Sequence, residues 1–527
     1  MGGFVKLRKK VPITMKRLGT KLPQLVPIDV PFPLPGLHFD RPRDQIPAGS
    51  AIDVDGIILR NGALERAPGR SYVGSSLGSD VVLLTNYLTT AGVLDLMAAT
   101  EDGLYKYTTS WANIPKSPAG DMGGTSWDLF WSAQIGEDLL FCQGVDQVYR
   151  YSGGSDFAIL NANCPTAKFG IGHQGRLLLV NTTESGIGYP YRVRWNVIDD
   201  IEDWTGPGSG YTDLDDKSDA VICIGLLNDY PVVFKESSIA VGNRTGQISP
   251  AYEFLERDSI NGTGCPHAVV NLGDRLAYIG SDNIYTFDLN KSTPIGDPVK
   301  AQFFDELNPQ YKDQCVGYLV PDLDEVRFCI PVGDSTYNNR EWIWNRKDNV
   351  WYRRNRETKA VAIKDSTTSP TWDDLSSVTW DSMVQRWNSG GLQPESSKFV
   401  MGTVSGYVYE EDQTARSLAG TAFESFYETG DIRIDASKYT GVSYVELFHR
   451  DVGVPCSITV GVSNDGGVNW SEDTRALTVG TSSGRILKKL FFKILSGTHL
   501  ALRLYVSSAT AHFEITGIRL WMTTAGK

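Results

Sequence analysis

The sequence predicts an all-β protein in which a β-propeller of six to eight blades, with seven favoured, precedes a C-terminal β-sandwich or jelly roll. A strand–turn repeat of roughly 40–50 residues runs from residue 51 to 411, and shorter alternating strands follow residue 423. Prolines cluster before residue 45, where we expect an extended arm. We therefore divide the chain into an arm (1–45), a propeller (46–415) and a sandwich (416–527).

The arm combines basic residues with prolines. Residues 1–21 contain seven basic residues and no acidic one, and six prolines follow between residues 23 and 42. Proline excludes helix and central strand, so we expect an extended, polyproline-like segment. Its apolar side chains favour packing along another surface, of its own domain or of a neighbour, over a free tail. The residues expected at such an interface are Lys6, Arg8, Lys9, Lys10, Lys16, Arg17, Lys21, Phe32 and Leu34.

The repeat consists of a hairpin whose second strand carries an aromatic or β-branched anchor. The stretch "DQVYRYSGG" (146–154) has relatives in "EDGLYKYTTS" (101–110), "SDNIYTFDLN" (281–290) and "VSGYVYEED" (404–412). Successive anchors are 44, 44, 46, 46, 58 and 64 residues apart, at Tyr105, Tyr149, Val193, Ile239, Tyr285, Ile343 and Tyr407. This period indicates propeller blades with insertions in the last two units, and the equal early spacing argues against a series of unrelated sandwiches.

The C-terminal region has a different pattern. After a polar bridge, "EEDQTARSLAG" (410–420), we expect about eight short strands, which is typical of a sandwich. The clearest alternation is in "YVELFHR" (444–450), "SITVGVS" (457–463), "ILKKLFFKIL" (486–495), "HLALRLYVSS" (499–508) and "HFEITGIRLWM" (512–522).

Charge and cysteine content limit the function classes. The net charge is −12, and the basic arm leaves about −19 for the remaining chain, which argues against a duplex-binding surface. The seven cysteines are scattered and never spaced as CxxC, so we expect reduced, buried thiols of a cytosolic protein and no zinc site. We find no apolar run long enough for a transmembrane helix and no signal peptide.

Four carboxylate clusters are the first candidates for chemistry: "DVDG" (53–56), "DDIED" (199–203), "TDLDD" (212–216) and "PDLDE" (321–325). A glycosidase needs two carboxylates facing each other across a cleft, but loop carboxylates far more often cap turns or stay solvated. None of the clusters follows the calcium-loop pattern, and the histidines show no paired metal-ligand spacing. With no nucleophile elbow, P-loop or dinucleotide motif, we predict no catalytic, cofactor or metal site.

The stretch "SNDGGVNW" (463–470) is similar to the Asp box of sialidase-like propellers. It occurs once and outside the predicted propeller. We interpret it as a structural turn in which Asp465 binds backbone amides, Gly466 and Gly467 supply positive φ, and Trp470 completes the motif.

Several segments resemble the propeller-containing tail proteins of short-tailed bacteriophages. The resemblance lies in "RVRWNVIDDIEDWT" (192–205), "YPVVFKESSIAVGNRTG" (230–246), "GCPHAVVNLGDRLAYIGSDNIYTFD" (264–288) and "DQIPAGSAIDVDGIILRNGALERAPGRSYV" (44–73). Asn196 stands where that family has Ser, and Asn283 where it has Gly. The stretches "ETGDIRID" (428–435) and "SNDGGVNWS" (463–471) resemble a module frequent in phage tail proteins.

This resemblance implies a tail nozzle, also called a tail hub or stabilisation protein. Such a protein is a structural part of the virion tail, made in the bacterial host cytoplasm, with no catalytic residues and no cofactor. Six copies would form a ring below the portal and the head–tail adaptor, in contact with tail fibres or tailspikes. DNA would pass through the lumen without sequence-specific binding, and the acidic body suits such a conduit. We expect residues 1–45 to cross the subunit interface.

Two other functions remain open at this point. The protein could bind a receptor or glycan through aromatic-rich loops, or it could be a propeller glycoside hydrolase. The first predicts measurable glycan binding, and the second predicts a carboxylate of raised pKa in the axial cleft.

Overall fold

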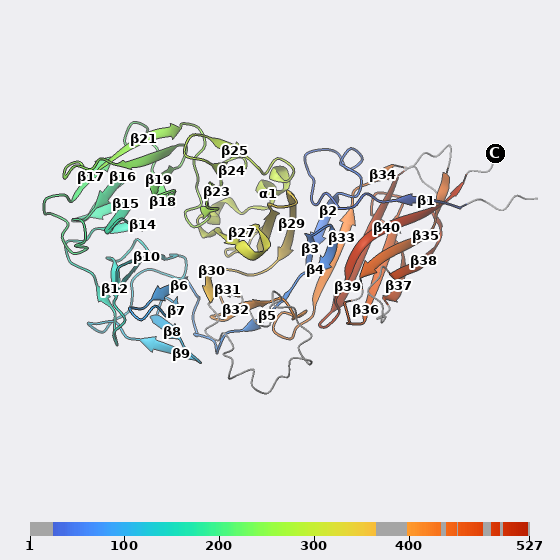
Figure 1. Ribbon diagram of the computed structural model, residues 1–527, viewed down its shortest axis with the longest axis horizontal. Helices are drawn as coiled ribbons and strands as arrows, with labels where there is room; N and C mark the ends of the chain where they lie inside the picture. The colour runs from blue at the N-terminus through green and yellow to red at the C-terminus, as the bar shows by residue number, and fades with distance from the viewer. Residues whose placement is uncertain are drawn as a thin grey trace, which may run out of the picture.

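The computed structural model describes residues 25–364, 398–433, 439–450, 452–477, 486–495 and 499–524. These residues form two bodies, a ring of small sheets and a two-sheet sandwich, which lie side by side in Figure 1. The fold is all-β, as the sequence predicts.

The first body is a propeller of seven four-stranded antiparallel sheets. Blade 1 contains β6 (Leu83–Leu88), β7 (Leu94–Ala99), β8 (Leu104–Tyr107) and β9 (Trp111–Ile114), and blade 2 contains β10 (Trp131–Ile135), β11 (Asp138–Cys142), β12 (Tyr149–Tyr151) and β13 (Ala158–Ile159). Blade 3 contains β14 (Thr166–His173), β15 (Arg176–Glu184), β16 (Ile187–Trp195) and β17 (Gly210–Asp213), and blade 4 contains β18 (Val221–Leu227), β19 (Tyr230–Lys235), β20 (Ile239–Arg244) and β21 (Tyr252–Asp258). Blade 5 contains β22 (Val270–Asn271), β23 (Leu276–Ile279), β24 (Ile284–Phe287) and β25 (Ser292–Pro294), and blade 6 contains β26 (Val316–Val320), β27 (Glu325–Ile330), β28 (Arg340–Asn345) and β29 (Val350–Asn355). Blade 7 contains β30 (Ala360–Lys364), β31 (Lys398–Gly402), β32 (Val408–Asp412) and β5 (Gly69–Tyr72).

The blades close into a ring in two ways. The first strand of each blade contacts the first strand of the next, and β30 contacts β6 to complete the cycle. In addition, β5 precedes blade 1 in the chain but pairs with β32, so that Tyr72 lies opposite Tyr409. The repeat is thus confirmed: six of the anchors lie in the third strand of their blades, and Tyr407 directly precedes β32. One of the predicted insertions contains helix α1 (Lys300–Glu306) and the 3₁₀ turns η1 (Pro309–Gln314) and η2 (Pro321–Leu323).

The second body packs two six-stranded sheets. One sheet contains β3 (Ile57–Arg60), β4 (Ala63–Arg66), β40 (Glu514–Thr524), β35 (Tyr439–Arg450) and β38 (Ile486–Leu495), with β1 (Leu25–Asp29) paired to β40. The other contains β2 (Ala51–Asp55), β33 (Phe423–Thr429), β39 (His499–Ser508), β36 (Cys456–Ser463) and β37 (Ser471–Leu477), with β34 (Ile432–Arg433) paired to β39.

The structure corrects the predicted boundary between arm, propeller and sandwich. Strands β2, β3 and β4, which we assigned to the propeller, belong to the sandwich, and the chain enters the propeller only at β5. Arg66 shows why: its buried guanidinium donates to Ser425 Oγ (2.9 Å), to Ala511 O (2.7 Å) and to two further carbonyls. These partners lie more than 350 residues further along the chain, and no local pattern reveals such a pairing.

A continuous hydrophobic core joins the two bodies. Trp342 and Trp351 of blade 6 belong to the same cluster of buried side chains as Val54 of β2 and Leu504 of β39. Polar contacts reinforce this junction, since Asp55 accepts hydrogen bonds from the backbone and side-chain amides of Asn355 (2.7 and 2.6 Å), and Asp53 pairs with Arg353 (2.8 Å). The propeller and the sandwich therefore form one rigid unit.

A buried ionic network ties blade 6 to blade 7. Arg327 binds both carboxylate oxygens of Glu411 (2.8 and 3.1 Å) and also Glu325 (2.7 Å). Arg354 donates to Glu411 (2.6 Å) and pairs with Glu341. Burial by itself would raise the pKa of Glu411, but Arg327 and Arg354 outweigh it and hold that pKa well below the usual range. The network fixes β32 beside blade 6, at the point where the ring closes.

Candidate functional site

The carboxylate clusters of the sequence have structural partners. In the first, Asp53 and Asp55 bind blade 6 at the junction described above. In the third, Asp213 binds Arg192 with both oxygens, each at 2.8 Å. In the fourth, Asp324 has left-handed backbone geometry (φ 53°) after η2, and Glu325 belongs to the buried network. In each of these three clusters, at least one carboxylate therefore has a structural role.

The segment 191–210 is also explained by packing. The Arg192 guanidinium lies between the rings of Tyr189 and Tyr211, 3.8 and 3.7 Å from their centroids. Trp204 is buried and donates from its indole N–H to Ile201 O (3.0 Å). Asp203 accepts from the amides of Thr205 and Gly206, and these bonds lower its pKa. The segment therefore forms the outer strands and a closed loop of blade 3.

Both positions that depart from the phage-tail pattern have satisfied side chains. Asn196 accepts from the amide of Leu177 (2.6 Å) and donates to the carbonyls of Val197 and Asp200. Asn283 donates to Asp297 (2.9 Å) and accepts from the amide of Ile284 (2.8 Å). The two amides therefore stabilise the loops in which they lie.

In the Asp-box turn, Asp465 accepts from the backbone amides of Val468 (3.1 Å) and Asn469 (2.9 Å), and its second oxygen binds the Asn469 amide group. These bonds lower the pKa of Asp465 to about 2. Gly466 and Gly467 both have positive φ (75° and 85°), and Trp470 packs on Gly461 of the preceding strand. The Asp465 carboxylate thus forms its hydrogen bonds within the turn and stabilises it.

The predicted interface arm is only partly described. Lys6, Arg8, Lys9, Lys10, Lys16, Arg17 and Lys21 lie outside the described residues. Leu34 is 3 % exposed within the protein's own core, and Phe32 packs against the same core. Of the two surfaces expected for the arm, these side chains therefore lie on that of their own chain. Residues 25–37 are held to their own chain because β1 pairs with β40 and the Leu37 amide binds Trp351 O (2.8 Å).

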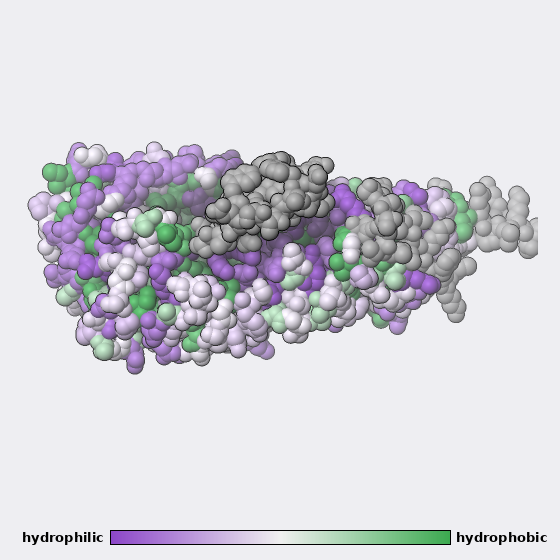
Figure 2. Space-filling model, turned by 60° about the horizontal axis from the view of Figure 1, so that its bottom comes forward, coloured by the Kyte–Doolittle hydropathy of each residue, from purple (hydrophilic) through white to green (hydrophobic). Residues whose placement is uncertain are grey.

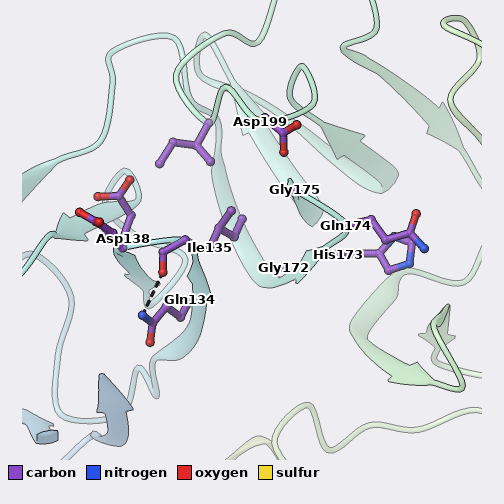
Figure 3. Close-up of a pocket in the computed structure, with 11 residues that line it drawn as sticks. Gln134, Ile135, Asp138, Gly172, His173, Gln174, Gly175 and Asp199 are labelled. Carbon is purple, nitrogen blue, oxygen red and sulfur yellow. Dashed lines mark hydrogen bonds between the residues drawn. The ribbon is translucent and has the colours of Figure 1, made fainter. Parts of the chain in front are cut away.

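The hollow shown in Figure 3 lies between blades 2 and 3, on the propeller face that carries the turns after their first strands. It measures about 630 Å³ and includes Asp138, His173 and Asp199. Asp138 and Asp199 lie on different sides of the hollow (Figure 3). Both ring nitrogens of His173 have partners, Tyr252 Oη (2.8 Å) and Asp229 O (2.9 Å). The imidazole therefore positions the turn and is not free to act on a ligand.

A second cavity lies on the propeller axis and opens on the opposite face. The inner part, about 190 Å³, is lined mainly by the first strands of the blades, including Leu83, Phe169 and Val316. The outer part, about 260 Å³, shares Leu129 and His267 with the inner part. Burial lowers the pKa of His267 to about 4, so its imidazole is neutral at pH 7.

The mouth of this axial cavity contains polar and aromatic residues that the sequence analysis did not single out. They are Trp127, Asp128, Gln143, Lys168, Asn181 and Asp313. Some lie on connections between blades and others within or just after the strands β11, β14 and β15, and no shared sequence pattern marks them. None of the four carboxylate clusters contributes to this mouth.

Other kinds of site are not found in the parts of the chain that the structure describes. These residues contain no group of His, Cys, Asp and Glu that could hold a metal ion, and none of their helices is long and apolar enough to cross a membrane. All seven cysteines are buried and unpaired, as predicted. On the face shown in Figure 2, hydrophilic residues predominate and hydrophobic ones are scattered.

The fold is that of a seven-bladed propeller joined to a β-sandwich. No protein-family model matches the chain, and no curated protein matches it either. Among solved structures, the chain is similar to BamB from Moraxella catarrhalis (9 % identity, TM-score 0.36, 73 % of this chain and 97 % of that one). It is also similar to the extracellular domain of the putative one-component system BT4673 from B. thetaiotaomicron (8 %, 0.39, 87 % and 60 %) and to an exo-β-1,3-galactanase from Phanerochaete chrysosporium (9 %, 0.25, 86 % and 100 %).

Proposed function

We propose that the protein is a structural component of a short bacteriophage tail. Copies of the chain assemble into a six-membered ring below the portal and the head–tail adaptor. The ring continues the channel through which DNA leaves the virion, and it has no catalytic role.

The observation that carries the proposal is how the resemblance is distributed over the fold. Segments 192–205, 230–246 and 264–288 lie in three consecutive blades, 3, 4 and 5. Segment 44–73 contains β2 to β5, the strands that join the sandwich to the propeller. A resemblance confined to one blade would reflect propeller geometry alone. This one also includes the junction, which a propeller does not require.

Two physical features support a role in a ring. The shared core gives the propeller and the sandwich a fixed relative orientation, which a ring subunit needs because a flexible joint would let the channel deform. The acidic composition outside residues 1–21 suits a DNA conduit, because phosphates are repelled by the wall and do not bind to it.

The mass of the purified protein tests the proposal. We expect native mass spectrometry to find a particle of about six times the 58.0-kDa chain mass, either alone or after addition of phage portal and adaptor proteins. A monomer or trimer that is unaffected by those partners would contradict the proposal.

A truncation tests the arm separately. Residues 25–37 are held to their own chain. We therefore propose that residues 1–24 are the part of the arm that crosses to the neighbouring subunit. We expect their deletion to prevent ring assembly. A control variant keeps these residues but replaces the seven basic side chains with glutamine, which separates the effect of charge from that of chain length. A ring that survives the deletion would contradict the role of the arm but not the ring itself.

A further inference from the structure

The mouth of the axial cavity has the features of a ligand site, which the ring role does not require. Connections leading into the first strands of several blades surround it, and it continues inward to His267 and the first strands. Its outer volume of about 260 Å³ is near the lower end of small-molecule pockets. The site therefore suits a ligand of about one ring with its substituents.

An exposed tryptophan is held rigidly at this mouth. Trp127 is 44 % exposed, and its ring pairs with that of Tyr311 at a centroid distance of 5.5 Å. Gln314 donates to the Trp127 carbonyl (2.6 Å), and the Lys359 ammonium lies 5.7 Å from the centroid of the indole ring. Lys359 is itself fixed by Asp80 (2.7 Å). These contacts hold the exposed indole ring of Trp127 in one orientation. Little side-chain conformational entropy is therefore lost when a ligand packs against the ring.

The wall of the cavity also contains polar groups without partners. Gln143 is 4 % exposed and donates from its amide to Gly123 O (2.6 Å), but its Oε1 has no hydrogen-bond partner in the described part of the chain. An unpaired buried carbonyl is costly unless a ligand or water binds it. Lys168 is exposed at the same mouth, and the described residues provide no ion pair for it. The site thus offers both acceptors and a donor.

We propose that the axial mouth binds a neutral saccharide, with one pyranose ring placed against Trp127. The C–H face of a sugar packs on an aromatic ring, and its hydroxyl groups both donate and accept. A hydroxyl donates to Gln143 Oε1, and another accepts from the Lys168 ammonium. A phosphate or a nucleic acid would meet the carboxylates of Asp128 and Asp313 at the same mouth, and a purely apolar ligand would leave Gln143 unsatisfied.

A printed array of bacterial-surface oligosaccharides, probed with the full-length protein, tests this site. The strongest binder is then measured as the free sugar by calorimetry. We expect Trp127→Ala to weaken binding at least tenfold, Trp127→Phe to weaken it less, and Lys168→Ala to weaken it about threefold. The matched control is Tyr230→Ala, which removes a similarly exposed ring (41 %) on the opposite face and leaves binding unchanged.

Three results would overturn the proposal: no binder on the array, an affinity that Trp127→Ala and Lys168→Ala both leave unchanged, or an equal loss in Tyr230→Ala. Equal melting temperatures of the variants show that each remains folded. If Trp127→Ala does not fold, Lys168→Ala provides the test. The measurement does not depend on the mass of the assembly. Failure of the saccharide site therefore leaves the ring proposal standing, and failure of the ring leaves the site standing.

Discussion

The buried network at blades 6 and 7 makes a sharp prediction about how the propeller closes. Glu411→Gln keeps the shape of the side chain but removes the negative charge of one of the buried carboxylates, which also include Glu325 and Glu341. These carboxylates lie among three buried arginines, Arg327, Arg354 and the nearby Arg356. Removing one partner of a buried ion pair costs about 3–5 kcal/mol, because the remaining charge stays buried without compensation. Arg356 is affected as well, since burial and the charge of Arg354 already lower its pKa to about 9 and the charge of Glu411 opposes this shift.

The local consequence can be measured by hydrogen exchange. Strand β32 pairs with β31 and β5, so weaker anchoring of Glu411 opens the closing blade before the rest of the ring. A loss of about 3–5 kcal/mol corresponds to roughly a hundred- to a few thousandfold faster exchange of the β32 and β5 amides, at about 1.4 kcal/mol per tenfold. Blade 3, on the opposite side of the ring, should change much less.

The neighbouring glutamate supplies the control. Glu410 pairs with Lys364 (3.0 Å) and Lys398 (3.2 Å), whose side chains are 29 % and 37 % exposed. Pairs of this kind contribute about 0–1 kcal/mol each, so Glu410→Gln should raise exchange by less than about thirtyfold. If Glu411→Gln changes exchange no more than Glu410→Gln does, the network does not hold the blade and the reasoning is wrong.

Three further predictions concern other parts of the molecule. Leu34→Ala should destabilise the junction by about 2–5 kcal/mol, seen as a lower urea midpoint, because Leu34 is almost fully buried; an effect like that of the exposed Leu88→Ala would contradict its burial. The pKa of His267 is lowered to about 4 in the folded protein, whereas in the unfolded chain it is about 6.5. Between these pH values the unfolded chain is protonated at His267 and the folded protein is not. Stability should therefore fall between pH 6.5 and 4 by up to about 3 kcal/mol, and the fall should be smaller in His267→Gln; an equal fall in that variant would refute the assignment. Asp465→Ala should speed exchange at the Val468 and Asn469 amides. In the parent protein this protection, present above the ordinary pKa of about 4, should be lost as pH falls toward 2; unchanged exchange would show that other bonds hold the turn.

Local pattern was sufficient to predict the blades. The second and third strands of a blade are neighbours in the chain, so their alternation and turns repeat at a regular spacing, as at Tyr105 and Tyr149. The five sandwich strands with the clearest alternation were found for the same reason. The Asp-box turn was also predictable, because all of its hydrogen bonds join residues fewer than five positions apart.

Pairing over long distances in the chain had to come from the tertiary structure. Arg66 and Ser425 are 359 residues apart, and β5 closes a blade whose other strands begin at Ala360. The axial mouth is another example, because Trp127 precedes β10, Gln143 follows β11 and Lys168 lies in β14, and only the packed blades bring these three residues together. The amino-acid sequence by itself determined which short segments are strands and where they turn, because those choices depend on neighbouring residues. The assignment of each strand to propeller or sandwich, and the residues that share a cavity, were decided by burial of the common core, which depends on the whole chain at once.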